Sequence, residues 1–418
     1  MRYIKRISDT ELENRLSRSG AVLIEGPKAC GKTELAKQAT KSEINIDTDK
    51  SVSTAMQFDP NILLKGETPR LLDEWQAQPK LWNYVRHSVD DRKSTGLYIL
   101  TGSANPIDDI SQHSGAGRFS KMRMRTLSWQ ESGWSDGTVS MKDILDGTVI
   151  QPQSVVDISL EDIALRICRG GWPQPLAYEF SDENAVLYTR DYVSALTDVD
   201  ISRVPDAPRH NPVLVRRCLR SIARNISTEV SISTIQKDME YDGGEAVDRD
   251  TIASYLNTLS RLFILEDLPA WSANIRSSVP LRKSPKRHFV DPSIATGVLA
   301  IGPDALMGDL RYTGFLFESE VIRDLRIYAE AHDAKVYFYR DASGREVDAI
   351  VEKSNGEFAA FEVKLGFEAA DEAAGSLLEF SELLVGKKPT SLNVITGNGF
   401  AHTRDDGVNV IPLAALGA

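Results

Sequence analysis

The chain has 418 residues, of which 41% are hydrophobic and 26% charged, a composition typical of globular proteins. Because this length exceeds that of a domain with a single hydrophobic core, two or three domains are expected. The formal net charge of -11 excludes a protein that attracts nucleic acid over its whole surface and leaves only a local basic patch for such contacts. Because the apolar runs are far shorter than the roughly 20 residues of a membrane span and the charged N-terminus lacks a signal-peptide core, we predict a soluble cytoplasmic protein with no membrane partner.

The first part of the chain alternates apolar runs with helical stretches, which is typical of a parallel sheet with crossover helices. The predicted strands are 21–25, 43–47, 70–73 and 96–100, and 32–40 is a predicted helix. Ligands bind at the carboxyl ends of the strands in such sheets. We therefore expect an α/β domain over residues 1–150, with its ligand site at that edge.

Residues 26–33 fit the phosphate-binding pattern G-x-x-x-x-G-K-[ST] without a mismatch, between a predicted strand and a predicted helix. Backbone N–H groups of such a loop, together with the N-terminus of the following helix, hold phosphate oxygens. Lys32 is expected to reach the β- and γ-phosphates, and Thr33 to offer its hydroxyl to Mg²⁺. The predicted nucleotide-binding residues of the loop are Gly26, Pro27, Lys28, Ala29, Cys30, Gly31, Lys32 and Thr33.

Acidic residues end the third predicted strand. Asp73 is placed to hold the magnesium shell with Thr33, and Glu74 to orient the attacking water. Polar residues also follow the fourth strand, and one of Thr101, Ser103 and Asn105 is a candidate sensor of the γ-phosphate, with a simple Gly/Ser turn as the alternative.

Arg118 lies between glycines in the segment Ser-Gly-Ala-Gly-Arg-Phe. A mobile arginine there is a candidate to contact the γ-phosphate in its own subunit or in a neighbouring copy of a homo-oligomer. A surface arginine is the alternative.

From about residue 150 the pattern becomes mostly helical. Helical patterns at 213–226, 231–239 and 250–261 precede a strand-like run at 263–268, which is the order of a winged helix. The third helix, with Asp250 expected at its cap, begins with acids that would repel DNA phosphates. We therefore interpret residues 151–280 as a helical, winged-helix-like domain that contacts protein or other domains, with DNA reading as the alternative.

Two basic clusters lie in this region. The first recurs at spacings of three and four along one helix and comprises Arg216, Arg217, Arg220 and Arg224. The second comprises Lys283, Lys286 and Arg287, and we interpret it as a solvated loop.

Residues 281–418 are expected to form a third, α/β domain with a helix at 318–332 and a hairpin at 345–364. If the hairpin turn has an odd number of residues centred near Asn355, Asp348 lies opposite Glu362 on one face. Two carboxylates and Lys364 on that face would suit Mg²⁺ binding and activation of water for phosphodiester attack. The alternative is a structural hairpin with solvated charges.

These motifs together carry a resemblance over nearly the whole chain. The phosphate loop and the segments LLDEWQ, YILTGSAN, SGAGRF, GGWP, LFILEDLPAW and HFVDPSIA are similar to those of bacterial and archaeal AAA+ ATP-binding proteins that carry a C-terminal domain of unknown function. The resemblance implies ATP as the nucleotide, an AAA+ core, a winged-helix-like middle and a restriction-endonuclease-like C-terminal domain.

The spacing of Asp348 and Glu362-x-Lys364 resembles that of the PD-(D/E)XK nucleases, in which these would be the catalytic residues and the metal ligands, with Glu318 as a further acid on the preceding helix. The sequence thus predicts a Mg²⁺-dependent ATPase whose nucleotide state controls a nuclease-like or nucleic-acid-binding domain. The alternative is a non-catalytic, nucleotide-gated scaffold that binds protein or DNA.

Overall fold

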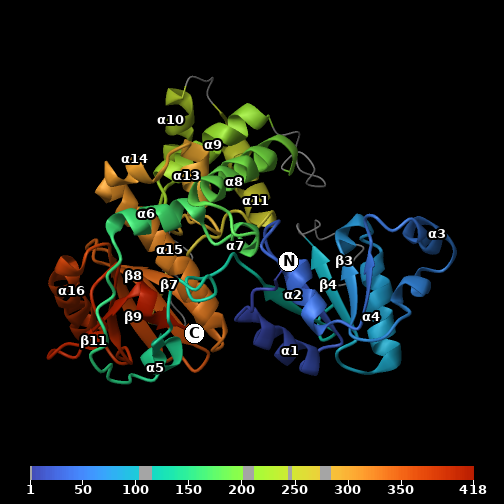
Figure 1. Cartoon of the computed structure of the whole chain (residues 1–418), viewed down its shortest axis with the longest axis horizontal. Coiled ribbons are helices and arrows are strands. Elements are labelled where there is room, and N and C mark those ends of the chain that lie inside the picture. Colours follow the sequence, from blue (N-terminus) through green and yellow to red (C-terminus); the bar gives the residue numbers. More distant parts are fainter. Residues whose placement is uncertain (1, 103–114, 201–210, 243–246, 274–283) are drawn as a thin grey trace.

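The structure is a computed structural model that describes residues 2–102, 115–200, 211–242, 247–273 and 284–418. Ser103, Asn105 and Lys283 from the predictions above lie outside the described residues. Figure 1 shows an N-terminal sheet unit on one side, and a helical region above a second sheet unit on the other.

The N-terminal unit is a parallel sheet in the order β2-β3-β4-β1-β5. Its strands are β1 (Ala21–Glu25), β2 (Ser42–Asn45), β3 (Arg70–Asp73), β4 (Tyr98–Gly102) and β5 (Phe119–Arg123). Its helices are α1 (Ser8–Arg18), α2 (Lys32–Ala39), α3 (Ser51–Phe58) and α4 (Leu81–Arg92). Residues 21–24 of β1 and 98–100 of β4 are all hydrophobic, because their side chains pack in buried clusters on both faces of the sheet. The parallel α/β prediction is confirmed, although β5 was not among the expected strands.

The middle region is helical, as expected. Its helices are α6 (Leu160–Arg169), α7 (Pro173–Ala177), α8 (Asp182–Ala195), α9 (Pro212–Arg224), α10 (Ile232–Tyr241), α11 (Arg249–Arg261), α13 (Ser293–Leu299) and α14 (Pro303–Met307). Asp248, rather than Asp250, is the N-cap of α11, because the Asp248 side chain accepts the Asp250 N–H.

After α11 the chain forms a short antiparallel ribbon, in which Leu265 pairs with Phe289 and Leu268 with Lys286. We call residues 264–268 and 286–290 the ribbon. Its second strand lies just before α13, and Ala270, two residues after its first strand, pairs with Phe338 of the C-terminal sheet.

The C-terminal unit is a mixed sheet in the order β11-β12-β10-β9-β8-β7. Its strands are β7 (Ala334–Arg340), β8 (Glu346–Lys353), β9 (Phe358–Lys364), β10 (Leu392–Thr396), β11 (His402–Thr403) and β12 (Asn409–Pro412). Helix α15 (Leu310–Glu330) covers one face and α16 (Ala370–Leu383) the other. In the β8–β9 hairpin Ala349 pairs with Phe361 and Glu352 with Phe358, a register centred on Asn355 as expected.

Packing divides the chain differently from the expected limits at residues 150 and 281. Strand β6 (Val139–Ser140) pairs with β13 (Leu416–Gly417), and the Val156 N–H donates to the Gly399 carbonyl, so residues 139–156 lie on the C-terminal unit. Conversely, α13 and α14 pack on α6, α8 and α9 of the middle region. One buried apolar cluster runs from the helices through α15 to one face of the C-terminal sheet, so these two regions share a core.

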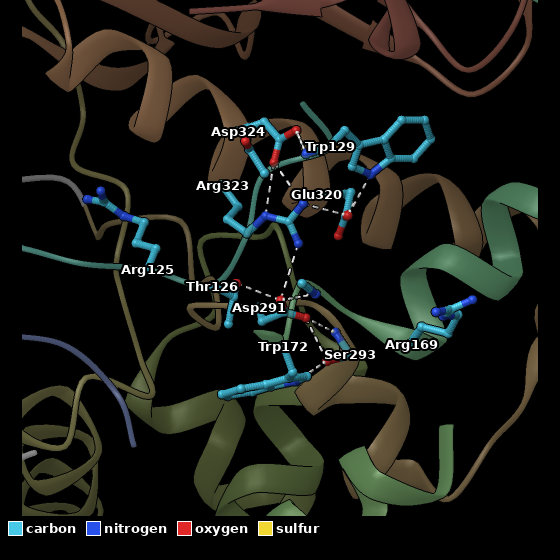
Figure 2. A network of polar contacts seen from close by, with 12 residues as sticks. Arg125, Thr126, Trp129, Arg169, Trp172, Asp291, Ser293, Glu320, Arg323 and Asp324 are labelled. Atoms are coloured by element: carbon cyan, nitrogen blue, oxygen red, sulfur yellow. Dashed lines mark hydrogen bonds and ion pairs between the residues drawn. The ribbon is translucent and has the colours of Figure 1, made fainter. Parts of the chain in front are cut away.

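A buried polar network ties the segment that follows β5 to this shared core (Figure 2). The Thr126 hydroxyl donates to Asp291 Oδ2 at 2.7 Å, and Arg323 contacts the same oxygen at 3.2 Å. The guanidinium of Arg323 also donates to Glu320 and Asp324 at 2.7 Å each. Arg323 is only 2% exposed and Asp291, Glu320 and Asp324 are 0% exposed. The segment after β5, the loop before α13 and helix α15 therefore meet through buried polar and charged groups.

Replacing Arg323 with methionine should therefore destabilise the shared core by about 3–5 kcal/mol, because it leaves buried carboxylates without their counter-charge. Urea unfolding followed by tryptophan fluorescence measures this loss. Arg311→Met, on the exposed side of the same helix, is the matched control and should change stability by about 0.5 kcal/mol or less. Equal losses in the two variants would contradict the role given to Arg323.

Candidate functional site

The phosphate loop connects β1 to α2 and its backbone requires glycine at two positions. Gly31, the N-cap of α2, has φ of 100°, in the left-handed region that favours glycine. A Cβ on Gly26 would lie 2.2 Å from the Met124 carbonyl oxygen, so the neighbouring chain leaves no room for a side chain there. The conformation of the loop therefore depends on a glycine at each of its ends, Gly26 for the close approach of Met124 and Gly31 for the positive φ.

Lys32 is buried, and its ammonium donates to the Gly26 carbonyl at 2.9 Å and to the Pro27 carbonyl at 2.7 Å. The lysine therefore lies over its own loop, where the phosphates of a nucleotide would meet it.

Asp73 receives hydrogen bonds from three neighbouring segments. Its Oδ1 accepts from the Thr33 hydroxyl at 2.9 Å and from the Thr101 hydroxyl at 2.5 Å. Its Oδ2 accepts from Asn45 Nδ2 at 3.3 Å. Asn45 was missed in the sequence, although its position at the end of β2, in register with Asp73, is a usable signal. The Thr33 hydroxyl and the Asp73 carboxylate are hard oxygen donors, which fit a Mg²⁺ ion that a nucleotide brings with it.

A cavity of about 460 Å³ adjoins the loop. Lys28, Lys32 and Thr33 line it from the loop, and Glu74 lines it from the end of β3. Glu74 has φ of 53° and its carboxylate accepts a hydrogen bond from Gln76. Pro173, Gln174 and Ala177 of α7 also line the cavity, so the middle region contributes a wall that the sequence did not predict.

Arg6 is a further residue that the sequence missed. It is 4% exposed and donates to the Cys30 carbonyl of the loop at 3.0 Å and to the carbonyls of Arg125 and Thr126 at 3.0 and 3.1 Å. It also pairs with Glu131 at 2.9 Å. Arg6 therefore connects the phosphate loop to the segment that enters the buried network.

Arg118 lies at the amino ends of the strands, whereas the phosphate loop lies at their carboxyl ends. Arg118 precedes Phe119, which pairs with Ala21 at the start of β1, whereas the loop follows Glu25 at the end of that strand. Its guanidinium pairs with Asp90 at 2.7 Å on the surface. Five residues of extended strand thus separate Arg118, which holds a surface position, from the phosphate loop of its own chain.

In the C-terminal unit the predicted acids do come together. Glu318 from α15, Asp348 from β8, and Glu362 and Lys364 from β9 line one cavity of about 850 Å³. Lys364 Nζ lies 2.9 Å from Glu362 Oε2, and the Val363 N–H donates to Asp348 Oδ2 at 2.9 Å. Burial raises the pKa of Glu362 to about 8, with Asp348 adding to the rise and Lys364 opposing it.

Lys286 also reaches these acids, which corrects its interpretation as part of a solvated loop. It is 3% exposed, and its ammonium lies 2.7 Å from Glu318 Oε1, 2.5 Å from Glu346 Oε1 and 3.5 Å from Asp348 Oδ1. Burial raises the pKa of Glu318 to about 8 against the attraction of this ammonium. A lysine cation thus sits where the sequence predicted a metal, and within the described ranges no group of three His, Cys, Asp or Glu side chains is arranged to hold a metal ion.

Comparison with known proteins divides the chain into three matched stretches. An AAA domain model matches residues 18–133, and two models of domains of unknown function, DUF8612 and DUF4143, match residues 160–305 and 313–416. The N-terminal part is therefore an AAA-type P-loop ATPase domain, which implies nucleotide binding and indicates ATPase activity. The expectation of a C-terminal domain of unknown function is also confirmed.

Similar proteins include the uncharacterized proteins Rv2008c of Mycobacterium tuberculosis and Mb2031c of Mycobacterium bovis, each 24% identical over 86% of this chain and 74% of their own length. Among solved structures, the Walker-type ATPase PABY2304 of Pyrococcus abyssi has a TM-score of 0.44 at 14% identity and covers 71% of this chain and 96% of its own. Of the helices that the structure describes, none has the length and apolar character needed to cross a membrane.

Gly26→Ala should abolish nucleotide binding, because the added methyl group can be accommodated only by displacing the loop or the Met124 carbonyl. Titration with a fluorescent ATP analogue measures the loss. Gly375→Ala, in α16 where a Cβ meets nothing within 4 Å, is the control and should leave binding unchanged. Wild-type affinity in Gly26→Ala would contradict the requirement for glycine at this position.

Proposed function

We propose that this protein is a Mg²⁺-dependent ATPase whose nucleotide state controls the acidic cleft of the C-terminal unit. The observation that carries the first half is the contact between Thr33 and Asp73, which places a hydroxyl and a carboxylate side by side next to Lys32. A triphosphate in the adjoining cavity would draw the Lys32 ammonium away from the loop carbonyls and onto its β- and γ-oxygens.

The roles of the other residues follow from their positions. Mg²⁺, when bound, would be held by Thr33 and Asp73 and would neutralise charge on the phosphates. Thr101 and Asn45 orient the Asp73 carboxylate. Glu74, on the wall of the same cavity, would accept the proton of the attacking water, and the hydrogen bond from Gln76 sets the direction of its carboxylate.

The middle region is proposed as a winged-helix-like module that connects domains and does not read DNA. Three helices and a ribbon occur in the expected order. Arg216 pairs with Asp198 and Arg220 with Asp242, so part of the basic stripe on α9 is neutralised within the region. We place the limits of the three domains between residues 126 and 139 and between 305 and 313, and we assign residues 139–156, which pack on the C-terminal sheet, to the C-terminal unit.

Control of the C-terminal cleft by nucleotide is supported by a continuous set of contacts. Arg6 joins the phosphate loop to residues 125 and 126, Thr126 joins them to Asp291, and Asp291 contacts Arg323 on α15. The same helix presents Glu318 to the cleft. Coupling requires that the two sites bias one element between two arrangements, and α15 is the element we propose.

The nuclease-like assignment of the cleft rests on the acids that meet there, and Lys286 is the observation that favours the rival function. With an ammonium among the acids, the cleft as folded does not fit a divalent ion. A nucleotide-gated scaffold that binds protein or nucleic acid without cutting is therefore the second candidate.

Lys32→Ala should abolish phosphate release from ATP, and Glu74→Gln should slow it by about 10²–10⁴-fold, because proton transfer to a positioned base is worth about that much. Asp348→Asn should leave release unchanged. A malachite-green assay with Mg²⁺ measures all three, and unchanged turnover in Lys32→Ala would refute the ATPase assignment. Cleavage of single- and double-stranded DNA and RNA by the same proteins separates the nuclease-like function, which requires Asp348, from the scaffold, which cuts nothing.

ATP should change the hydrogen-exchange protection of α15 in the wild-type protein, because the contacts of Arg6, Thr126 and Asp291 join that helix to the phosphate loop. Thr126→Val keeps the side-chain shape but removes the donor to Asp291, so it should reduce that change while leaving ATP affinity intact. Thr138→Val, at an exposed threonine directly before β6, is the matched control. An identical response of α15 in both variants would mean that coupling takes another route.

A further inference from the structure

Lys286 is held in position by the backbone of the ribbon. Its N–H donates to the Leu268 carbonyl at 3.0 Å and its carbonyl accepts from the Leu268 N–H at 2.9 Å. The side chain leaves the ribbon toward α15 and β8, and its ammonium lies 5.8 Å from the centre of the Phe338 ring. A buried lysine is tolerated only where its charge is compensated.

The compensation comes from three carboxylates. Glu318, Glu346 and Asp348 lie around the ammonium of Lys286 at 2.7, 2.5 and 3.5 Å, and Glu318 accepts a hydrogen bond from it. The remaining acid of the cleft, Glu362, pairs with Lys364 at 2.9 Å. Every acid that the sequence assigned to a metal therefore has a partner within the chain.

A divalent ion bound to Glu318 and Asp348 would share these oxygens with the ammonium. Two cations about 4 Å apart in a partly buried site repel each other strongly, so the ion and the ammonium exclude one another. The cluster of carboxylates favours a bound cation, and the ammonium of Lys286 occupies that position.

We propose that Lys286 is the resident cation of the C-terminal acidic cleft and excludes divalent metal ions from Glu318, Asp348 and Glu362 as long as the ribbon stays in place. This inference deepens the proposed function, since it names what keeps the cleft inactive, and it rests on the assignment of that cleft as a controlled site.

The ribbon is well placed for such control because its first strand, and the residue directly after its second strand, contact residues 125 and 126 of the ATPase domain. Glu266, on the first strand, pairs with Arg125 at 2.6 Å. Asp291, directly after the second strand, accepts from the Thr126 hydroxyl at 2.7 Å. Lys286 is thus carried by a segment whose neighbours are residues 125 and 126, and a shift of those residues would act on the lysine as well as on α15.

The test is a Mn²⁺ titration of the full-length protein without nucleotide, followed by calorimetry and by the electron paramagnetic resonance signal of free Mn²⁺. In the wild-type background, Glu362→Gln should change nothing, because the cleft binds no Mn²⁺ while Lys286 is present. A wild-type site that disappears in Glu362→Gln would overturn the proposal, and this arm does not depend on how any Lys286 variant folds.

Lys286→Met should create one Mn²⁺ site per chain, at least about tenfold tighter than any binding by the wild type in the same cleft, because a unit charge next to the ion has been removed. The double variant Lys286→Met/Glu362→Gln should lose that site again. Lys335→Met, at an exposed lysine of β7, is the matched control and should bind as the wild type does.

Lys286→Arg keeps the charge and should still exclude Mn²⁺, with circular dichroism confirming the fold of each variant. A folded Lys286→Met protein that gains no Mn²⁺ site would overturn the proposal. Because no nucleotide is present, an ATPase that fails the phosphate-release test leaves these results interpretable, and the failure of one proposal is distinguishable from that of the other.

Discussion

The structure depends on a guanidinium group that is closed off from water. Burial opposes the charge of Arg323, but Glu320, Asp324 and Asp291 more than compensate and raise the pKa of the arginine well above its ordinary value. Such a cluster is stable only when every partner is in place, because a missing partner leaves a buried charge uncompensated. Its partners come from a loop before α13, from α15 and, through Trp129 and Thr126, from the end of the ATPase domain. The interdomain arrangement therefore follows from the need to surround one arginine.

The same helix that carries Arg323 also carries Glu318, so the interdomain network and the acidic cleft are parts of one rigid element. At its C-terminal end Glu330 pairs with Arg125 of the ATPase domain at 2.8 Å. An α-helix advances about 1.5 Å per residue, so Glu318 and Glu330 lie roughly 18 Å apart along one axis. Displacement of the ATPase domain relative to this helix would have to break the Arg125 contacts or move the cleft acids with it.

Some of this arrangement follows from local sequence, and some does not. The phosphate loop and its partner Asp73 are recognisable because each is a short pattern at the end of a buried strand, and the hairpin about Asn355 is recognisable because alternation fixes which side chains share a face. Lys286 could not be placed in this way. A lysine in a Pro/Lys-rich stretch reads the same whether it is solvated or buried, and only pairing of the ribbon, set by residues far apart in the chain, decides. The position of Arg118 was not predictable for a similar reason, because β5, which places it at the amino ends of the strands, was not among the expected strands.

The shared core has a consequence for how the chain can be divided. The three stretches matched by separate domain models are not three independent folding units, since one apolar cluster runs from the middle helices through α15 to the C-terminal sheet. Strand β6, at residues 139–140, pairs with β13, at residues 416–417, so the last strand of the chain holds a segment that precedes the middle helices in sequence. A fragment cut at residue 310 would expose the helix face that buries Leu316, Phe317 and Val321 and would aggregate or unfold. Exchange of ATPase domains between related chains would succeed only if the segment 125–131 stays with the core it enters, which places the usable junction inside the matched AAA stretch and not at its end.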